Sequence, residues 1–216
     1  MIQLHYYPGN ASMTPHMLLE ELGTPFDLKL VDRAQNAHKS PAYLKLNPNG
    51  LIPVLVDGDL VLYETAAIVL HLVDTHPQAG LAPTTIGSPD RALFYKWLVW
   101  LSSSVQAMMP HYFYADRMAA PGNADGAREV KAQAEAKIGA WMDQLDAHFA
   151  AHGGPWLLGE RFSALDPYAF MLCRWTRGMQ RPARSLAQLR PFTERMLARP
   201  AVQRVFATEG LAAPYV

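Results

Sequence analysis

The stretch that decides the fold reads NPNGLIPVL and runs from Asn47 to Leu55. Its first four residues are typical of a turn, and an apolar run follows at once. Pro53 has no N–H to donate to a neighbouring strand, so it is expected at the entry of a strand and not inside one. The backbone of Ile52 should therefore lie outside the sheet ladder, where it can bind something else. The Ile52-Pro53 bond is also of the kind in which a cis peptide is affordable.

A hairpin is expected directly after this stretch. The apolar runs Val54–Val56 and Leu60–Tyr63 flank Asp57-Gly58, which is a strong hairpin signal. Glu64-Thr65 then opens a helix with apolar periodicity. The pattern thus predicts an unpaired backbone edge, a carboxylate and a hydroxyl close to one another.

The rest of the first eighty residues mixes strand and helix patterns. Strands are expected at Ile2–Tyr6 and Phe26–Leu30, and helices at Met17–Leu22, Ala42–Leu46 and Ala66–Val73. The order βαβ, short helix, ββα is the thioredoxin-like pattern. It predicts a mixed four-stranded sheet that is covered by helices on both faces.

The sequence changes character at residues 80–89, where glycines and prolines break any regular element and indicate a linker. Beyond the linker the strand patterns vanish. Helices are expected at residues 90–118 with a bend near Pro110, and at 127–151, 167–177, 186–198 and 201–208. The predicted organisation is a thioredoxin-like domain over residues 1–79, a linker over 80–89 and an all-helical domain over 90–216.

Composition excludes several classes of function. The 216 residues are half apolar and carry no net charge, which argues against a nucleic-acid partner or a basic membrane-surface helix. The single cysteine, Cys173, rules out an internal disulfide and a cysteine-based metal cluster, and we expect no metal. No apolar run is long enough to span a bilayer and no basic leader opens the chain, so the cytoplasm is the expected compartment.

Several segments together resemble the glutathione S-transferase family. They are Tyr6–Ser12, His38–Pro41 followed by Leu44, Asn47-Pro48 and Gly50, the Ile52-Pro53 pair, and Glu64–Ile68. Their order and spacing match over nearly the whole chain, and the bacterial cytosolic members, of the beta-like and phi-like groups, are the most similar. The resemblance implies a detoxifying transferase that uses glutathione as co-substrate on the first domain and forms a homodimer.

The resemblance also implies how two parts of glutathione are held. The cysteinyl unit would pair with the backbone at Ile52, beside Pro53, like an added strand. Glu64 would pair with the γ-glutamyl ammonium group. Thr65 and the backbone N–H groups at the start of the next helix would hold the γ-glutamyl carboxylate.

The remaining glutathione contacts implied by the resemblance come from two loops. His38 and Lys39 match a His-Lys pair of the family and would bind the glycine carboxylate. Ala11 and Leu51 complete the predicted binding residues. Leu51 stands where the family often has glutamine, so one side-chain contact is absent.

The sulfur of glutathione is expected at the start of the first helix, where backbone N–H groups and the helix dipole stabilise a thiolate. Ser12 is the first choice as hydrogen-bond donor to the sulfur, although it also reads as a simple helix cap. Asn10 is the second choice. Tyr6 or Tyr7 is a further alternative, and because strand residues alternate in direction only one of them can face the site.

Two departures from the bacterial pattern bear on mechanism. Ala11 stands where a cysteine is usual, and Gln106 stands where a histidine is usual. A mixed disulfide through a protein thiol is therefore disfavoured. Conjugation is the preferred interpretation. Glutathione-dependent reduction of disulfides or peroxides, and a non-catalytic binding scaffold, stay open as alternatives.

The second substrate is expected to be a small hydrophobic electrophile. By resemblance it is held against the first long helix of the helical domain, where Met108, His111 and Tyr112 are candidate contacts. Methionine-rich aromatic surfaces adapt to varied ligands. A stripe of methionine and aromatic residues is nonetheless more often part of a core or of a dimer surface.

Overall fold

The computed structural model describes all residues from Met1 to Val216. The chain forms two compact units, and each is described by itself. The first unit contains residues 1–86 and 196–213, and the second contains residues 87–195 and 214–216. None of the helices combines the length and the apolar character that crossing a membrane requires.

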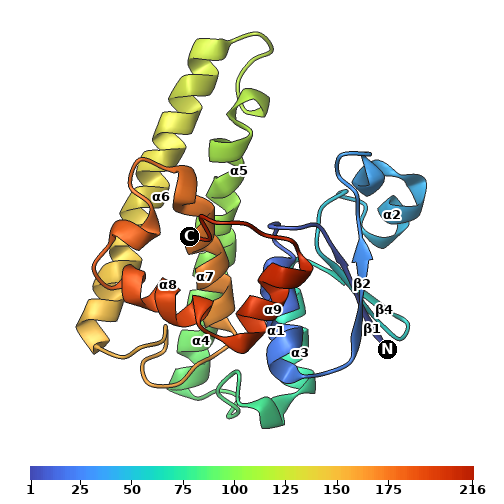
Figure 1. The fold of residues 1–216 in the computed structure, drawn as a ribbon, viewed down its shortest axis with the longest axis vertical. Helices are drawn as coiled ribbons and strands as arrows, with labels where there is room; N and C mark the ends of the chain where they lie inside the picture. Colours follow the sequence, from blue (N-terminus) through green and yellow to red (C-terminus); the bar gives the residue numbers. More distant parts are fainter. The chain divides into compact units, whose positions relative to one another are not determined.

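The first unit is built on a mixed sheet of four strands (Figure 1). The strands are β1 (Ile2–Tyr6), β2 (Phe26–Leu30), β3 (Val54–Asp57) and β4 (Leu60–Tyr63), in the spatial order β2-β1-β3-β4. β1 and β2 are parallel, and the other two pairs are antiparallel. The helices are α1 (Met13–Leu22), α2 (Pro41–Leu46), α3 (Thr65–Thr75) and α9 (Pro200–Thr208). The predicted thioredoxin-like pattern and its hairpin are confirmed.

The two faces of the sheet are covered by different helices, with α2 on one side and α1 and α3 on the other (Figure 1). Successive side chains of a strand point to opposite faces. Val54 and Val56 accordingly pack with Tyr43 of α2. Leu55 between them points to the other face and is completely buried. This alternation fixes the register of β3.

The second unit contains helices only, as expected. They are α4 (Pro89–Val99), α5 (Ala107–Phe113), α6 (Ala124–His152), α7 (Leu165–Trp175) and α8 (Leu189–Leu197), of which the last two residues of α8 belong to the first unit. The Asp166 carboxylate at the start of α7 accepts hydrogen bonds from the backbone N–H groups of Ser163 and Leu157, each at 2.7 Å. The bond from the Ser163 N–H to the Asp166 carboxylate is one of the two hydrogen bonds of a capping box, with aspartate in the place of glutamate.

The long helix expected over residues 90–118 is interrupted. Residues Trp100–Gln106 form a π-helical segment, η3, between α4 and α5. Pro110 has no N–H for the carbonyl of Gln106, and its ring crowds that carbonyl. The π-helical segment ends at Gln106. The bend was expected near Pro110, and the irregularity is found upstream of that proline.

The division of the chain differs from the expected one at its C-terminal end. The break between Ile86 and Gly87 falls inside the expected linker, but residues 196–213 group with the first unit and not with the helical domain of 90–216. In this region α9 packs against α1, and ion pairs from Arg199, just before α9, and from Arg204 join the two segments. The Arg199 guanidinium donates two hydrogen bonds to Glu21, at 2.6 and 2.8 Å, and Arg204 pairs with Glu20.

Candidate functional site

The sheet brings the predicted binding segments to one of its ends. Val54, at the start of β3, pairs with His5 near the end of β1 and with Tyr63 at the end of β4. Leu30, the last residue of β2, lies opposite Tyr6. The loops that carry Asn10, His38, Ile52 and Glu64 all leave the sheet at these four strand ends. The strand register alone thus gathers these loops.

The segment before β3 is held by side-chain hydrogen bonds, and its own backbone lies outside the strand pairing. The Ile52-Pro53 peptide is cis, and the strand pairing begins only after it. The carbonyl of Leu51 accepts hydrogen bonds from the Tyr43 hydroxyl at 2.7 Å and from the Asn47 amide at 2.9 Å. Burial raises the pKa of the Tyr43 phenol, so this group remains a donor at neutral pH.

The loop that carries His38 and Lys39 packs against the turn before Ile52. Gly50 has φ +61°, and a Cβ added there would lie 2.9 Å from the carbonyl oxygen of His38. Only glycine permits this close approach of two backbones. His38 is half-buried and Lys39 is exposed. Both residues thus lie next to the segment that carries Ile52.

Glu64 combines exposure with an unfavourable backbone. It precedes α3 with φ +75° and makes no capping hydrogen bond with its side chain. A non-glycine residue in such a conformation costs about 1–3 kcal/mol. The next residue, Thr65, is the first of α3 and is 4% exposed. The fold therefore holds a carboxylate in solvent at a helix N-terminus in a strained conformation.

The loop before α1 turns its hydroxyl inward. Ser12 is completely buried, and its hydroxyl donates to the carbonyl of Tyr7 at 3.2 Å and accepts from the N–H of Tyr7 at 3.3 Å. Asn10 is half-buried. Its amide oxygen accepts the N–H of Ala11 at 2.7 Å, which leaves the amide NH₂ as the donating end. Of the two predicted sulfur donors, Asn10 is the one on the surface.

Tyr6 and Tyr7 lie on opposite sides of the sheet. The Tyr6 ring is edge-on to His16 of α1, with ring centres 6.1 Å apart. The Tyr7 ring belongs to the cluster under α2 and has the Arg33 guanidinium 5.7 Å from its centre. The alternation expected from strand geometry is present, although Tyr7 lies just beyond β1.

Sequence reasoning missed Glu209, which follows α9. Both side chains of the Glu209–His16 pair are completely buried, with 2.8 Å between Oε1 and the His16 Nδ1. The second oxygen, Oε2, accepts the N–H of Gly9 at 2.8 Å. No local sequence pattern signals this contact, because 200 residues separate Gly9 from Glu209.

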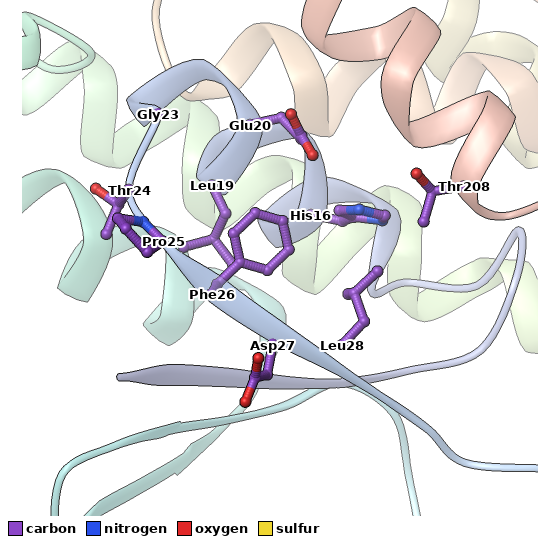
Figure 2. Close-up of a pocket in the computed structure, with 10 residues that line it drawn as sticks. All are labelled: His16, Leu19, Glu20, Gly23, Thr24, Pro25, Phe26, Asp27, Leu28 and Thr208. Carbon is purple, nitrogen blue, oxygen red and sulfur yellow. The ribbon is translucent and has the colours of Figure 1, made fainter.

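A surface cavity of about 460 Å³ lies beside His16, where Figure 2 shows the imidazole with Phe26, Leu28 and Thr208 around it. The His16 and Phe26 rings are edge-on, with their centres 5.7 Å apart. The cavity is lined by His16, Leu19, Glu20, Gly23, Thr24, Pro25, Phe26, Asp27, Leu28 and Thr208. None of the predicted glutathione contacts lines it, so this hollow is not the predicted site.

The three predicted electrophile contacts all belong to α5 in the second unit, and all are half-buried. The Tyr112 hydroxyl donates to the carbonyl of Gly178 at 3.1 Å. Burial, and then the negative charge of Glu135, raise the pKa of Tyr112, so its hydroxyl stays protonated. Gln106 accepts a hydrogen bond from the Tyr168 hydroxyl.

Comparison with known proteins gives matches to one family over most of the chain. The model of the glutathione S-transferase N-terminal domain matches residues 10–75, and that of the C-terminal domain matches residues 111–209. Glutathione S-transferase GST-4.5 of Xanthomonas campestris is 30% identical over 216 residues, which cover 97% of this chain and all of that protein.

Solved structures are similar over nearly the whole chain as well. A glutathione S-transferase from Xylella fastidiosa superimposes with a TM-score of 0.87 at 32% identity, covering 98% of this chain and all of that one. A glutathione transferase homologue from Sulfitobacter with bound glutathione gives a TM-score of 0.87 at 29% identity, with 98% and 99% covered. The chain belongs to the glutathione S-transferase family.

Proposed function

We propose that this chain is a glutathione transferase, which lowers the thiol pKa of glutathione and directs the thiolate onto a small hydrophobic electrophile. The observation that carries the proposal is the common sheet end from which the loop at Asn10, the backbone at Ile52 and the helix start at Glu64 all leave. These groups differ in chemistry and match different parts of one tripeptide.

The three parts of glutathione would be bound as follows. The cysteinyl amide pairs with the backbone at Ile52, whose neighbour Leu51 is already fixed through its carbonyl. The γ-glutamyl ammonium pairs with Glu64, and its carboxylate meets the first N–H groups of α3 and the Thr65 hydroxyl. His38 and Lys39 bind the glycine carboxylate.

The sulfur would lie at the start of α1. Because the Ser12 hydroxyl donates to the carbonyl of Tyr7, we now favour the Asn10 amide and the backbone N–H groups of this helix start as donors to the thiolate. Each unit by which the thiol pKa falls corresponds to about 1.4 kcal/mol in favour of the thiolate. Ser12 then acts by shaping the loop.

The second substrate and the assembly complete the proposal. We assign contact with the electrophile to Met108, His111 and Tyr112, whose half-buried side chains offer apolar and polar surface. Holding two reactants together supplies much of the rate gain in such reactions. A homodimer and a cytoplasmic location belong to the proposal as well, and size-exclusion chromatography with light scattering tests the dimer.

Calorimetry and an activity assay test the proposal together. The purified chain should release heat on binding glutathione at micromolar to millimolar concentration and should conjugate glutathione to a chlorodinitrobenzene. Absence of binding heat at millimolar glutathione would overturn the proposal and favour a non-catalytic scaffold. Binding without conjugation, but with turnover of a glutathionylated disulfide, would favour the reductase instead.

A further inference from the structure

We propose that Glu209 is a positioning residue, whose buried carboxylate fixes the loop that presents the sulfur of glutathione. The inference rests on the proposed function, because that function makes the loop Gly9–Ser12 the place of the sulfur. Glu209 itself is completely buried at its side chain, so it acts through the loop and not by touching glutathione.

One carboxylate holds the loop on both sides. Oε2 accepts the N–H of Gly9 before the loop, and Oε1 contacts Nδ1 of His16 after it, both at 2.8 Å. His16 in turn donates its backbone N–H to the carbonyl of Ser12 at 3.0 Å. Residues 10–12 therefore lie between two anchors on a single side chain. A shift of this loop breaks at least one of the two contacts.

The packing of α9 on α1 does not explain why a carboxylate is buried at position 209. Burying a charged group costs free energy that only good partners offset, and an apolar side chain would fill the same space without that cost. The two helices are already joined by Arg199–Glu21 and Arg204–Glu20. The contact that a carboxylate adds is the one to the backbone N–H of Gly9.

The imidazole at the second anchor is itself held in place. The His16 ring is edge-on to Tyr6 of β1 and to Phe26 of β2, with centre distances of 6.1 and 5.7 Å. Figure 2 shows His16 beside Phe26 and Leu28. Two strands and one carboxylate thus fix its orientation. His16 therefore fixes the start of α1 relative to the sheet.

The test compares three substitutions with a matched control. Glu209→Ala removes both contacts. Glu209→Asp keeps the charge but shortens the side chain by one methylene. Glu209→Gln keeps an oxygen for Gly9 and a polar atom for His16. The control, Glu21→Ala, breaks the Arg199 pair between the same two helices but leaves the loop untouched.

The readouts separate positioning from stability. For each variant we would measure the melting temperature, kcat, KM for glutathione, and the thiol pKa of bound glutathione from thiolate absorbance. Glu209→Ala should lower kcat about 10- to 100-fold, because misplaced catalytic groups cost that much. It should also raise the thiol pKa, while KM changes by less than about threefold. The kcat and thiol pKa of Glu209→Asp should lie between those of the wild type and Glu209→Ala, and those of Glu209→Gln should stay near the wild-type values.

Several results would overturn the inference. One is a thiol pKa and kcat at wild-type values in Glu209→Ala. Another is equal loss of activity in Glu21→Ala and Glu209→Ala at equal loss of melting temperature, which would make the residue merely structural. If Glu209→Ala does not fold, Glu209→Asp decides by the same criteria.

Hydrogen exchange of the Gly9 amide adds an arm that needs no glutathione. This amide should be protected in the wild type and should exchange faster in Glu209→Ala but not in Glu21→Ala. A wild type that neither binds nor conjugates glutathione overturns the proposed function, whatever the variants do. A functional wild type with an unprotected Gly9 amide overturns the positioning role alone.

Discussion

Two helix starts lie at the same end of the sheet, and they are built in opposite ways. At α1 the Ser12 side chain is completely buried and hydrogen-bonded to Tyr7. At α3 the Glu64 side chain is exposed, without a capping hydrogen bond, on a backbone with φ +75°. The polar side chain at the first start is hydrogen-bonded within its own loop. The polar side chain at the second start is exposed on a strained backbone, and in the function proposed above it pairs with glutathione.

The largest effect should come from Glu64→Gly. Removing the carboxylate should weaken glutathione binding about 100-fold, which corresponds to about 2.7 kcal/mol. The same change relieves an unfavourable φ, so the melting temperature should rise. Calorimetry and thermal unfolding measure the two quantities. Weaker binding together with a lower melting temperature would contradict the contrast between the two helix starts.

The next effect concerns α1. Ser12→Ala should cost about 1–2 kcal/mol of unfolding free energy, because the N–H and carbonyl of Tyr7 lose a buried partner. Asn10→Ala should leave stability nearly unchanged but lower conjugation more than Ser12→Ala does. Urea unfolding and steady-state kinetics on both variants decide the order. A larger loss of conjugation in Ser12→Ala, at equal stability, would restore Ser12 as the sulfur donor.

A smaller effect is expected for the hydroxyl of Thr65. Thr65→Val keeps the shape of the side chain and should weaken glutathione binding about tenfold, as loss of a hydrogen bond to a charged group does. Thr65→Ser, the matched control, should bind within about threefold of the wild type. Equal affinity of the valine and serine variants would remove Thr65 from the γ-glutamyl site.

The smallest effect is a pH dependence in β1, the strand that leads into α1. Burial, and then the positive charge of Lys29, lower the pKa of His5 below its usual 6.5. The unfolded chain therefore binds a proton more readily, and the stability that neutral His5 provides is lost as pH falls below about 6.5. His5→Gln should reduce the drop in unfolding free energy between pH 8 and pH 5. An unchanged drop would contradict the assignment of this pH dependence to His5.

The sequence predicts the parts of this molecule that rest on near neighbours. Pro53, Asp57-Gly58 and the apolar runs around them dictate the hairpin, and this hairpin brings the segments with Ile52 and Glu64 to the same end of the sheet. The direction of the Ser12 hydroxyl could not be predicted from the sequence, because this group can bond either to a ligand or to the backbone of Tyr7. The contact of Glu209 with Gly9 is out of reach for a local pattern altogether. Pro110 indicates an irregular helix, but it does not predict that the backbone hydrogen bonds become π-helical at Trp100–Gln106.

The discontinuous first unit, residues 1–86 with 196–213, bears on how the protein is made. A ribosome releases the sheet with α1, α2 and α3 early, but α9 emerges only after residues 87–195 of the second unit have been synthesised. Domains generally fold in the order of synthesis, but here the first unit cannot complete its packing until residues 196–213 have been synthesised. Until then the ring nitrogen of His16 and the amide of Gly9 lack their carboxylate. A gene fragment that stops near residue 86 would therefore encode an unfinished module.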